Sequence, residues 1–172
     1  TEIYTLSLHD ALPIWVQGSD RWPEPRWPGP VVVGRLYGPS KPDLRSPLVL
    51  RGDLPAGTEI SLRLHLLSSR AQLQARADGA VIGEHLCDPR TQPDDWKPQP
   101  RDHGGWTYHE PARETWFRVV LPARTREFTV ENVGGDWVIA GELSLREPGR
   151  PTRTFDTDQE WEIGRASCRE RV

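Results

Sequence analysis

The chain has 172 residues, and its 22 Lys and Arg against 25 Asp and Glu give a formal net charge of −3 at pH 7. This balance provides no basic surface for nucleic acid or for an anionic membrane, and no apolar run approaches the roughly 20 residues that a membrane-spanning helix needs. We therefore expect no nucleic-acid partner and no membrane partner, and the length suffices for one domain with a hydrophobic core.

The two ends, residues 1–14 and 162–172, share one origin at the level of DNA. The codons ACT CTT TCC CTA CAC GAC GCT CTT CCG ATC encode residues 5–14, and their reverse complement, read in a shifted frame, encodes residues 163–171 and begins the codon of Val172. This DNA resembles a common short-read sequencing adapter. We expect both ends to be translated adapter that was never selected to pack, with Trp15 and Glu162 as junction residues.

Setting the ends aside removes several candidate sites. His9 and Asp10 are then no catalytic pair, and Cys168 is no disulfide partner for Cys87, which excludes a disulfide framework. Because the chain contains no Met, we expect the stretch between the adapters to be a fragment of a longer gene, so that the lack of a signal peptide carries no information.

Residues 15–30 are rich in Pro and Trp. Prolines spaced this closely exclude a helix and deny a central strand its backbone donors. We expect a linker, or a strap across a surface that Trp22 and Trp27 anchor.

Residues 31–147 alternate short apolar segments with turn signals. Ile60, Leu62, Leu64 and Leu66 alternate with polar residues, which predicts a half-buried strand over residues 58–67. A hairpin with a type I′ turn is predicted where Asp78-Gly79 separates two such runs in residues 73–82. Further strands are predicted at residues 31–36, 47–51, 115–121, 127–133 and 137–146.

Two segments lack this pattern. Residues 87–113 contain closely spaced prolines and show no periodicity, so we expect a long irregular loop, a kind of segment that is usually functional or disordered. Residues 148–161 are expected to be a C-terminal extension with at most an edge strand at 152–155.

About eight short strands with almost no helix predict an all-β fold, an antiparallel β-sandwich of the jelly-roll type, with a barrel as the alternative. We place this sandwich domain at residues 31–147.

Several of these segments resemble a family. Residues 132–137 (Asn-Val-Gly-Gly-Asp-Trp), the turn Leu121-Pro122-Ala123, the hairpin at 73–82 and residues 38–45 are similar to motifs of β-sandwich modules attached to bacterial glycoside hydrolases. Those modules resemble carbohydrate-binding and galactose-binding-like jelly rolls. One departure is that Arg124 stands where the family's turn usually has Gly.

The resemblance implies a non-catalytic accessory module of a secreted enzyme, extracellular or periplasmic. Its implied partners are a polysaccharide or oligosaccharide and a catalytic domain in the same chain. An alternative stays open: a purely structural module, whose exposed Trp rings pack on the neighbouring domain and bind no ligand.

The long loop provides the best ligand candidates. Flat rings can stack on the apolar face of a pyranose while carboxylates and imidazole bond its hydroxyls. The candidate ligand-binding residues are Trp96, Trp106, Tyr108, Asp95, Asp102 and His103. The alternative for each ring is that it folds inward and pins the loop.

Other conspicuous residues favour structural roles. Asn132 and Asp136 are expected to bond nearby backbone in the Gly-Gly turn, and Trp137 to cover one end of the core. Trp116 shares a strand face with Arg118, and the sequence leaves open whether it meets solvent, a neighbouring domain or a ligand.

No cofactor, metal or catalytic residue is predicted. His85 is expected to point outward and Cys87 to be an ordinary thiol, and no zinc-ligand spacing accompanies them. Glu131 and Glu142 are expected on solvent faces rather than as the facing carboxylates of a glycoside hydrolase.

Overall fold

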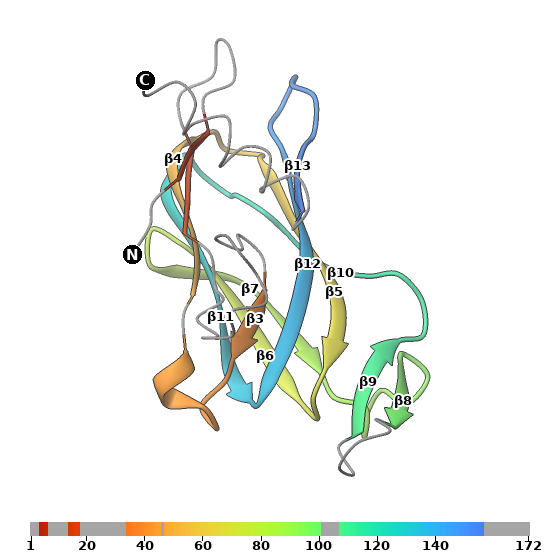
Figure 1. The fold of residues 1–172 in the computed structure, drawn as a ribbon. Coiled ribbons are helices and arrows are strands. Elements are labelled where there is room, and N and C mark those ends of the chain that lie inside the picture. The colour runs from red at the N-terminus through yellow and green to blue at the C-terminus, as the bar shows by residue number, and fades with distance from the viewer. Residues whose placement is uncertain (1–3, 7–13, 18–33, 46, 101–106, 157–172) are drawn as a thin grey trace, which may run out of the picture.

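The structure is a computed structural model that describes residues 4–6, 14–17, 34–45, 47–100 and 107–156. Two antiparallel sheets pack face to face, which confirms the all-β sandwich (Figure 1). Within the described residues there is no α-helix, and the one short helical turn is the 3-10 helix η1 at Pro42–Leu44. No helix in this part of the chain is long and apolar enough to cross a membrane.

The first sheet has the strand order β1-β2-β4-β11-β6-β7. Its strands are β1 (Tyr4–Leu6), β2 (Ile14–Gln17), β4 (Leu48–Leu54), β6 (Ala71–Ala77), β7 (Ala80–Cys87) and β11 (Thr125–Gly135). The second sheet has the order β13-β12-β5-β9-β8, while β10 also pairs with β5 and β3 with β12. Its strands are β3 (Arg35–Tyr37), β5 (Glu59–Leu67), β8 (Trp96–Pro100), β9 (Thr107–Pro111), β10 (Thr115–Val120), β12 (Trp137–Arg146) and β13 (Arg153–Asp156).

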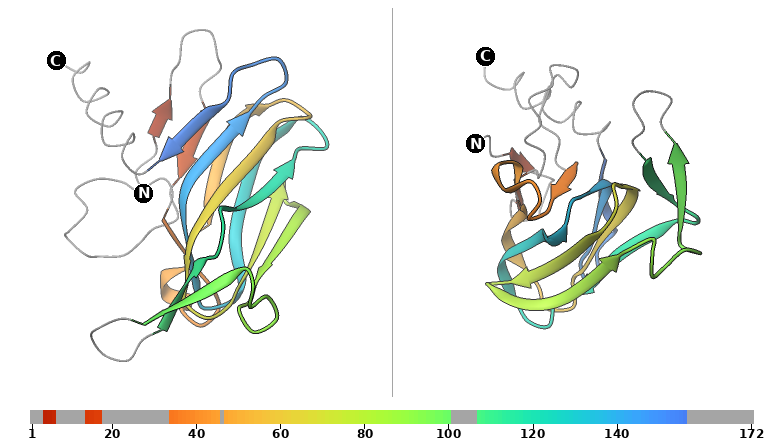
Figure 2. Two further views of the ribbon diagram at one scale, coloured as in Figure 1. Left: turned by 90° about the vertical axis from the view of Figure 1, so that its right-hand side faces the viewer. Right: turned by 90° about the horizontal axis from the view of Figure 1, so that it is seen from below.

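Successive strands cross repeatedly between the sheets. β4 and β5 lie in different sheets, as do β5 and β6, β10 and β11, and β11 and β12. This repeated crossing is compatible with a jelly roll. Figure 2 shows the two layers from the side and from below, with the β8–β9 hairpin projecting from the body of the sandwich.

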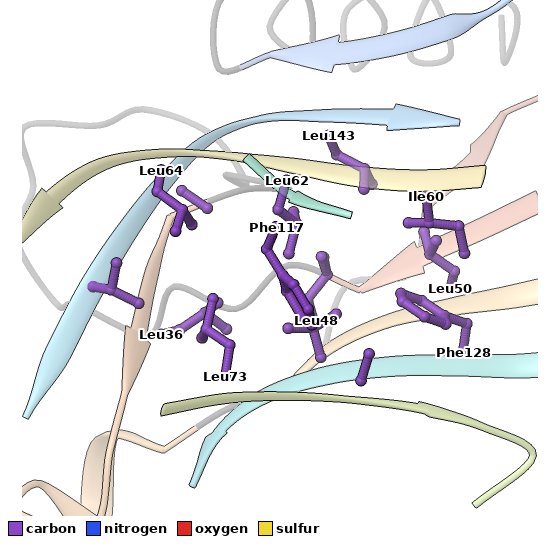
Figure 3. Close-up of a cluster of buried hydrophobic side chains, with 14 of the residues drawn as sticks. Leu36, Leu48, Leu50, Ile60, Leu62, Leu64, Leu73, Phe117, Phe128 and Leu143 are labelled. Atoms are coloured by element: carbon purple, nitrogen blue, oxygen red, sulfur yellow. The ribbon is translucent and has the colours of Figure 1, made fainter. Parts of the chain in front are cut away.

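The core fills the space between the sheets (Figure 3). Alternation decides its composition, because every second side chain of a strand points to the same face. Ile60, Leu62 and Leu64 of β5 are each at most 2% exposed, as the period-two pattern predicts. They meet Phe128 from the first sheet and Phe117 from β10. The prediction is wrong for Leu66, because a register shift at His65 changes the alternation and Leu67, 0% exposed, is buried instead. Each fully buried side chain of this kind stabilises the fold by roughly 1.5–3 kcal/mol.

The Asp78-Gly79 turn forms as predicted. Both residues have positive φ, 46° and 85°, which is the requirement of a type I′ turn. The Asp78 carboxylate also accepts hydrogen bonds from the backbone N–H of Arg126 (3.0 Å) and of Glu127 (2.9 Å). The turn of one hairpin therefore fixes the start of β11.

The corner between β11 and β12 is held by the Asn132 side chain, which is 1% exposed. Its amide donates to the carbonyls of Leu36 (3.2 Å) and Asp136 (3.1 Å), and its oxygen accepts from the N–H of Gln72 (3.0 Å) and Gly134 (3.2 Å). These four bonds confirm the structural role expected of Asn132.

Two further residues complete this corner. Gly38 is required there, because a Cβ would collide with the carbonyl oxygens of Gly135 and Asp136. The Asp136 carboxylate accepts from the Ser40 hydroxyl (2.8 Å) rather than from nearby backbone, which corrects the expectation for that residue.

Residues 87–113 are not the continuous loop that the sequence predicts, because β8 and β9 form a hairpin there. The closely spaced prolines predicted a loop, but an edge strand tolerates proline. Pro98 and Pro100 are two residues apart on an edge strand, so both turn their missing N–H toward the free edge, where no ladder bond is lost. Residues 101–106 lie outside the described part of the chain.

Strand β2 pairs with the edge of β4, and β1 pairs with β2. Trp15, Val16 and Gln17 are opposite Arg51, Leu50 and Val49. An edge strand offers backbone donors and acceptors to any extended segment, whatever its side chains. This pairing therefore does not test the adapter origin of residues 1–14.

Candidate functional site

The structure describes part of the ligand site that the sequence predicts on residues 87–113. Asp95, Trp96 and Tyr108 lie in described segments, whereas Trp106, Asp102 and His103 lie outside the described residues. Ligand binding by this set stays a prediction.

Asp95 and Trp96 lie at the base of the β8–β9 hairpin, and Tyr108 lies farther along it. Trp96 is 3% exposed and packs in the core, which agrees with the alternative that this ring pins the segment. The Asp95 carboxylate accepts from the Arg113 guanidinium (2.9 Å), and its backbone carbonyl accepts from the N–H of Ala112 (2.8 Å). Tyr108 is half-buried on β9, opposite Gln99. Asp95 and Trp96 thus hold the hairpin to the sandwich, whereas Tyr108 lies nearer the far end of the hairpin.

A different group of side chains gathers on the outer face of the second sheet. Strand pairing of β10, β5 and β12 places Trp116, Arg63 and Glu142 in one cross-strand row. The next row holds Arg118, Ser61 and Ser144, and a third joins Glu59 to Arg146.

Alternation explains why these side chains face outward. Leu62 and Phe117, which are their chain neighbours, are buried between the sheets, as are Leu143 and Leu145 on β12. The sheet therefore presents polar residues and one indole on the face opposite the core.

A groove runs over these rows, with a volume of about 270 Å³. It is lined by Glu59, Ser61, Trp116, Arg118, Glu142, Ser144, Arg146 and Thr152. We call it the Trp116 groove. It combines one aromatic ring with hydroxyls, carboxylates and guanidinium groups, which is the chemistry of a small-ligand site.

Hydrogen bonds orient the ring and the carboxylates. The Trp116 indole N–H donates to Glu114 (2.8 Å), and Arg63 lies between Glu114 (3.9 Å) and Glu142 (3.8 Å). At the other end, Arg146 donates to Glu59 (2.5 Å).

The two serine hydroxyls are also held. Ser61 donates to Glu59 (3.4 Å) and Ser144 to Glu142 (3.3 Å). The groove is thus a connected polar surface rather than a set of independent side chains.

His65 continues the outward row of β5 beyond Arg63. Its pKa lies below the ordinary value because burial disfavours the imidazolium, and because the charge of Arg63 repels it. The His65 ring lies over Gly141 of β12, where a Cβ would meet the ring and make it shift.

A second concavity, of about 580 Å³, is lined by Gly52, Asp53, Arg124 and Arg126. The Asp53 carboxylate in this concavity is already paired, because the Arg124 guanidinium donates two hydrogen bonds to it. The same contact holds the pKa of Asp53 below its usual value. No aromatic ring lines it. Its size alone does not make it the better ligand site.

The contacts of Asp88, Cys87 and His85 are structural. Asp88, 4% exposed, accepts two hydrogen bonds from the Arg90 guanidinium, each 3.0 Å, and its pKa is lowered by that contact. Burial raises the pKa of the Cys87 thiol to about 12, which confirms an unreactive thiol. His85 does not point outward as predicted. It faces the gap between the sheets and stacks on Phe117, with ring centroids 5.7 Å apart, because a β-bulge in β7 changes the alternation upstream of it.

Trp137 lies half-buried at the start of β12, with the Arg35 guanidinium 5.7 Å from its ring centroid. Within the described residues, no group of three or more His, Cys, Asp or Glu side chains is placed to hold a metal ion.

Comparison of the chain with protein-family models, with curated proteins and with solved structures found no match. The function is therefore inferred from the fold and from the Trp116 groove.

Proposed function

We propose that the domain is a non-catalytic β-sandwich module that contacts carbohydrate, accessory to a secreted bacterial glycoside hydrolase. The observation that carries this proposal is the Trp116 groove, where a half-buried indole lies beside hydroxyls and carboxylates. A pyranose has an apolar face for the ring and hydroxyls for the polar side chains.

The fixed orientation of the ring supports binding. Glu114 accepts from the indole N–H, which holds the Trp116 ring in one orientation before a ligand arrives. A ring that is already placed loses less conformational freedom on binding. The resemblance of residues 132–137 to hydrolase accessory modules supports the same function from the sequence side.

Binding is better supported than hydrolysis. Each groove carboxylate is paired with an arginine, Glu59 with Arg146 and Glu142 with Arg63. Glu114 also faces Arg63, and the mostly polar lining of the groove gives none of these carboxyl groups the apolar pocket that keeps a general acid protonated.

The test is titration of the protein with a panel of soluble polysaccharides and their oligosaccharides, by calorimetry. We expect saturable binding that Trp116→Ala weakens about tenfold, since an aromatic contact of this kind contributes roughly 0.5–1.5 kcal/mol. Trp106→Ala is the comparison variant, because it reports on the sequence-predicted loop site. Near-ultraviolet circular dichroism checks that each variant is folded.

The two variants separate the possible outcomes. Loss with Trp116→Ala places binding in the groove, and loss with Trp106→Ala alone places it in the loop. A folded protein that binds no glycan in the panel would refute the proposal and favour the alternative of a structural module that packs on a neighbouring domain.

A further inference from the structure

The charges of the Trp116 groove are unequally paired. Each groove carboxylate has an arginine within 4 Å, because Arg146 contacts Glu59 and Arg63 contacts Glu142. Arg118 makes no ion pair with any described residue. A cationic ligand would therefore find both groove carboxylates occupied, whereas an anionic ligand would find one guanidinium available.

Arg118 is placed at the level of the hydroxyls. It is opposite Ser61 on β5, and Ser61 is opposite Ser144 on β12, so one row carries a guanidinium followed by two hydroxyl groups. Ser144 also lies 3.3 Å from the Thr154 hydroxyl, which extends the row to β13. Such a row offers guanidinium donors to an anion at one end, and since Ser61 is 5% exposed, the hydroxyls of Ser144 and Thr154 are the ones that can bond sugar hydroxyls.

The present contact of Arg118 is easily exchanged. Its guanidinium carbon lies 5.5 Å from the centroid of the Trp116 ring, and the side chain is exposed. A cation–π contact at an exposed site is weak, whereas a guanidinium binds a carboxylate through two parallel charge-assisted hydrogen bonds. The same contact keeps the guanidinium next to the ring on which a sugar would stack.

We propose that the groove selects acidic saccharides, with Trp116 stacking on a hexuronic acid ring and Arg118 binding its carboxylate. This inference rests on the proposed function, since it concerns the ligand of the same groove. It assigns Arg118 as a residue that determines specificity, while Trp116 supplies the contact common to acidic and neutral sugars.

The experiment compares hexuronic acid oligosaccharides with their methyl esters, which lack the negative charge of the carboxylate and carry one added methyl group. Pectin-, alginate- and glucuronoxylan-derived oligosaccharides supply three backbones. For at least one of these backbones, we expect the wild-type chain to bind the free acid about fivefold to tenfold more tightly than the ester, the range of one partly exposed charged hydrogen bond. Added salt should reduce this preference.

Two arginine variants test the assignment. In Arg118→Gln the affinities for acid and ester are expected to become equal. Arg126→Gln is the matched control, because it removes an exposed arginine that does not line the groove and should keep the preference. Sulfated oligosaccharides of a neutral backbone form a further arm, and binding of these but of no uronate would overturn the carboxylate assignment.

The outcomes distinguish this inference from the proposed function. If acid and ester bind equally and Trp116→Ala weakens both, the selection for acidic sugars is wrong while carbohydrate binding stands. If Arg118→Gln still binds the free acid more tightly than the ester, Arg118 is not the residue that recognises the carboxylate. If no oligosaccharide of any kind binds, both proposals fail together.

Discussion

Replacing Asn132 by Ala should destabilise the sandwich more than any other single polar change in the β11–β12 corner. The substitution removes two donors and two acceptor contacts at a site that is 1% exposed. The carbonyl of Leu36 and the N–H groups of Gln72 and Gly134 then lose these hydrogen bonds, whereas the carbonyl of Asp136 keeps the N–H of Gly38 as a donor. A buried polar group left unpaired costs about 1–3 kcal/mol.

The lower end of that range, applied to three groups, gives a loss of about 3 kcal/mol. For a chain of this length, about 1 kcal/mol shifts the melting temperature by roughly 3 °C, so a decrease on the order of 9 °C is expected. Urea unfolding followed by tryptophan fluorescence measures the free energy directly. Asn132→Asp should rescue little, because a carboxylate cannot donate to the two carbonyls.

Gln72→Ala is the matched control for this prediction. Only the backbone N–H of Gln72 bonds Asn132, and the Gln72 side chain lies half-buried on the outer face of β6. This variant should lose less than about 1 kcal/mol. If Asn132→Ala were equally mild, the four bonds would not hold the corner, and the structural explanation of the Asn-Val-Gly-Gly-Asp-Trp motif would be wrong.

Two further predictions concern the ends of the chain and pH. A chain limited to residues 15–161 should show the same near-ultraviolet circular dichroism as the whole chain, because residues 1–14 and 162–172 are expected to be translated adapter; loss of the signal would show that they are needed for folding. His85 has its pKa lowered from 6.5 by burial, so the unfolded chain binds more protons than the folded one, and stability falls as pH drops below about 6.5. His85→Phe keeps the stacking on Phe117 and should be less sensitive between pH 7.5 and about 5, as measured by urea unfolding at each pH; equal sensitivity of the two proteins would contradict this role of His85.

The local features of the fold could be predicted from the sequence. Alternation identified Ile60, Leu62 and Leu64 as inward residues of β5, and Asp78-Gly79 identified its turn, because both depend on residues close together in the chain. Alternation failed at Leu66 and Leu67, where a register shift against β12 changes the face of the strand. The β8–β9 hairpin could not be predicted, because Pro98 and Pro100 exclude a central strand and only their placement at a sheet edge makes them acceptable.

The groove could be predicted only in part. The sequence places Trp116 and Arg118 on one face of a strand, but it does not say which strands lie beside that face. The strand register brings Arg118 into one row with Ser61 and Ser144, although Ser61 and Ser144 are 83 positions apart in the sequence. Contacts of that range are set by the whole sheet and not by any local pattern.

The position of the groove on the outer face of the sheet allows ligand binding to be tested separately from stability. Residues of the groove alternate along β5, β10 and β12 with residues of the core, so each groove side chain has core neighbours but lies on the opposite face of the sheet. Arg118 is exposed on the outer face of β10, whereas its chain neighbour Phe117 belongs to the core between the sheets. A change at Arg118 should therefore alter ligand choice while the free energy of unfolding stays within about 0.5 kcal/mol of the wild-type value. A larger loss of stability would mean that Arg118 supports the fold, and a loss of binding in that variant would then say nothing specific about recognition of an acidic sugar.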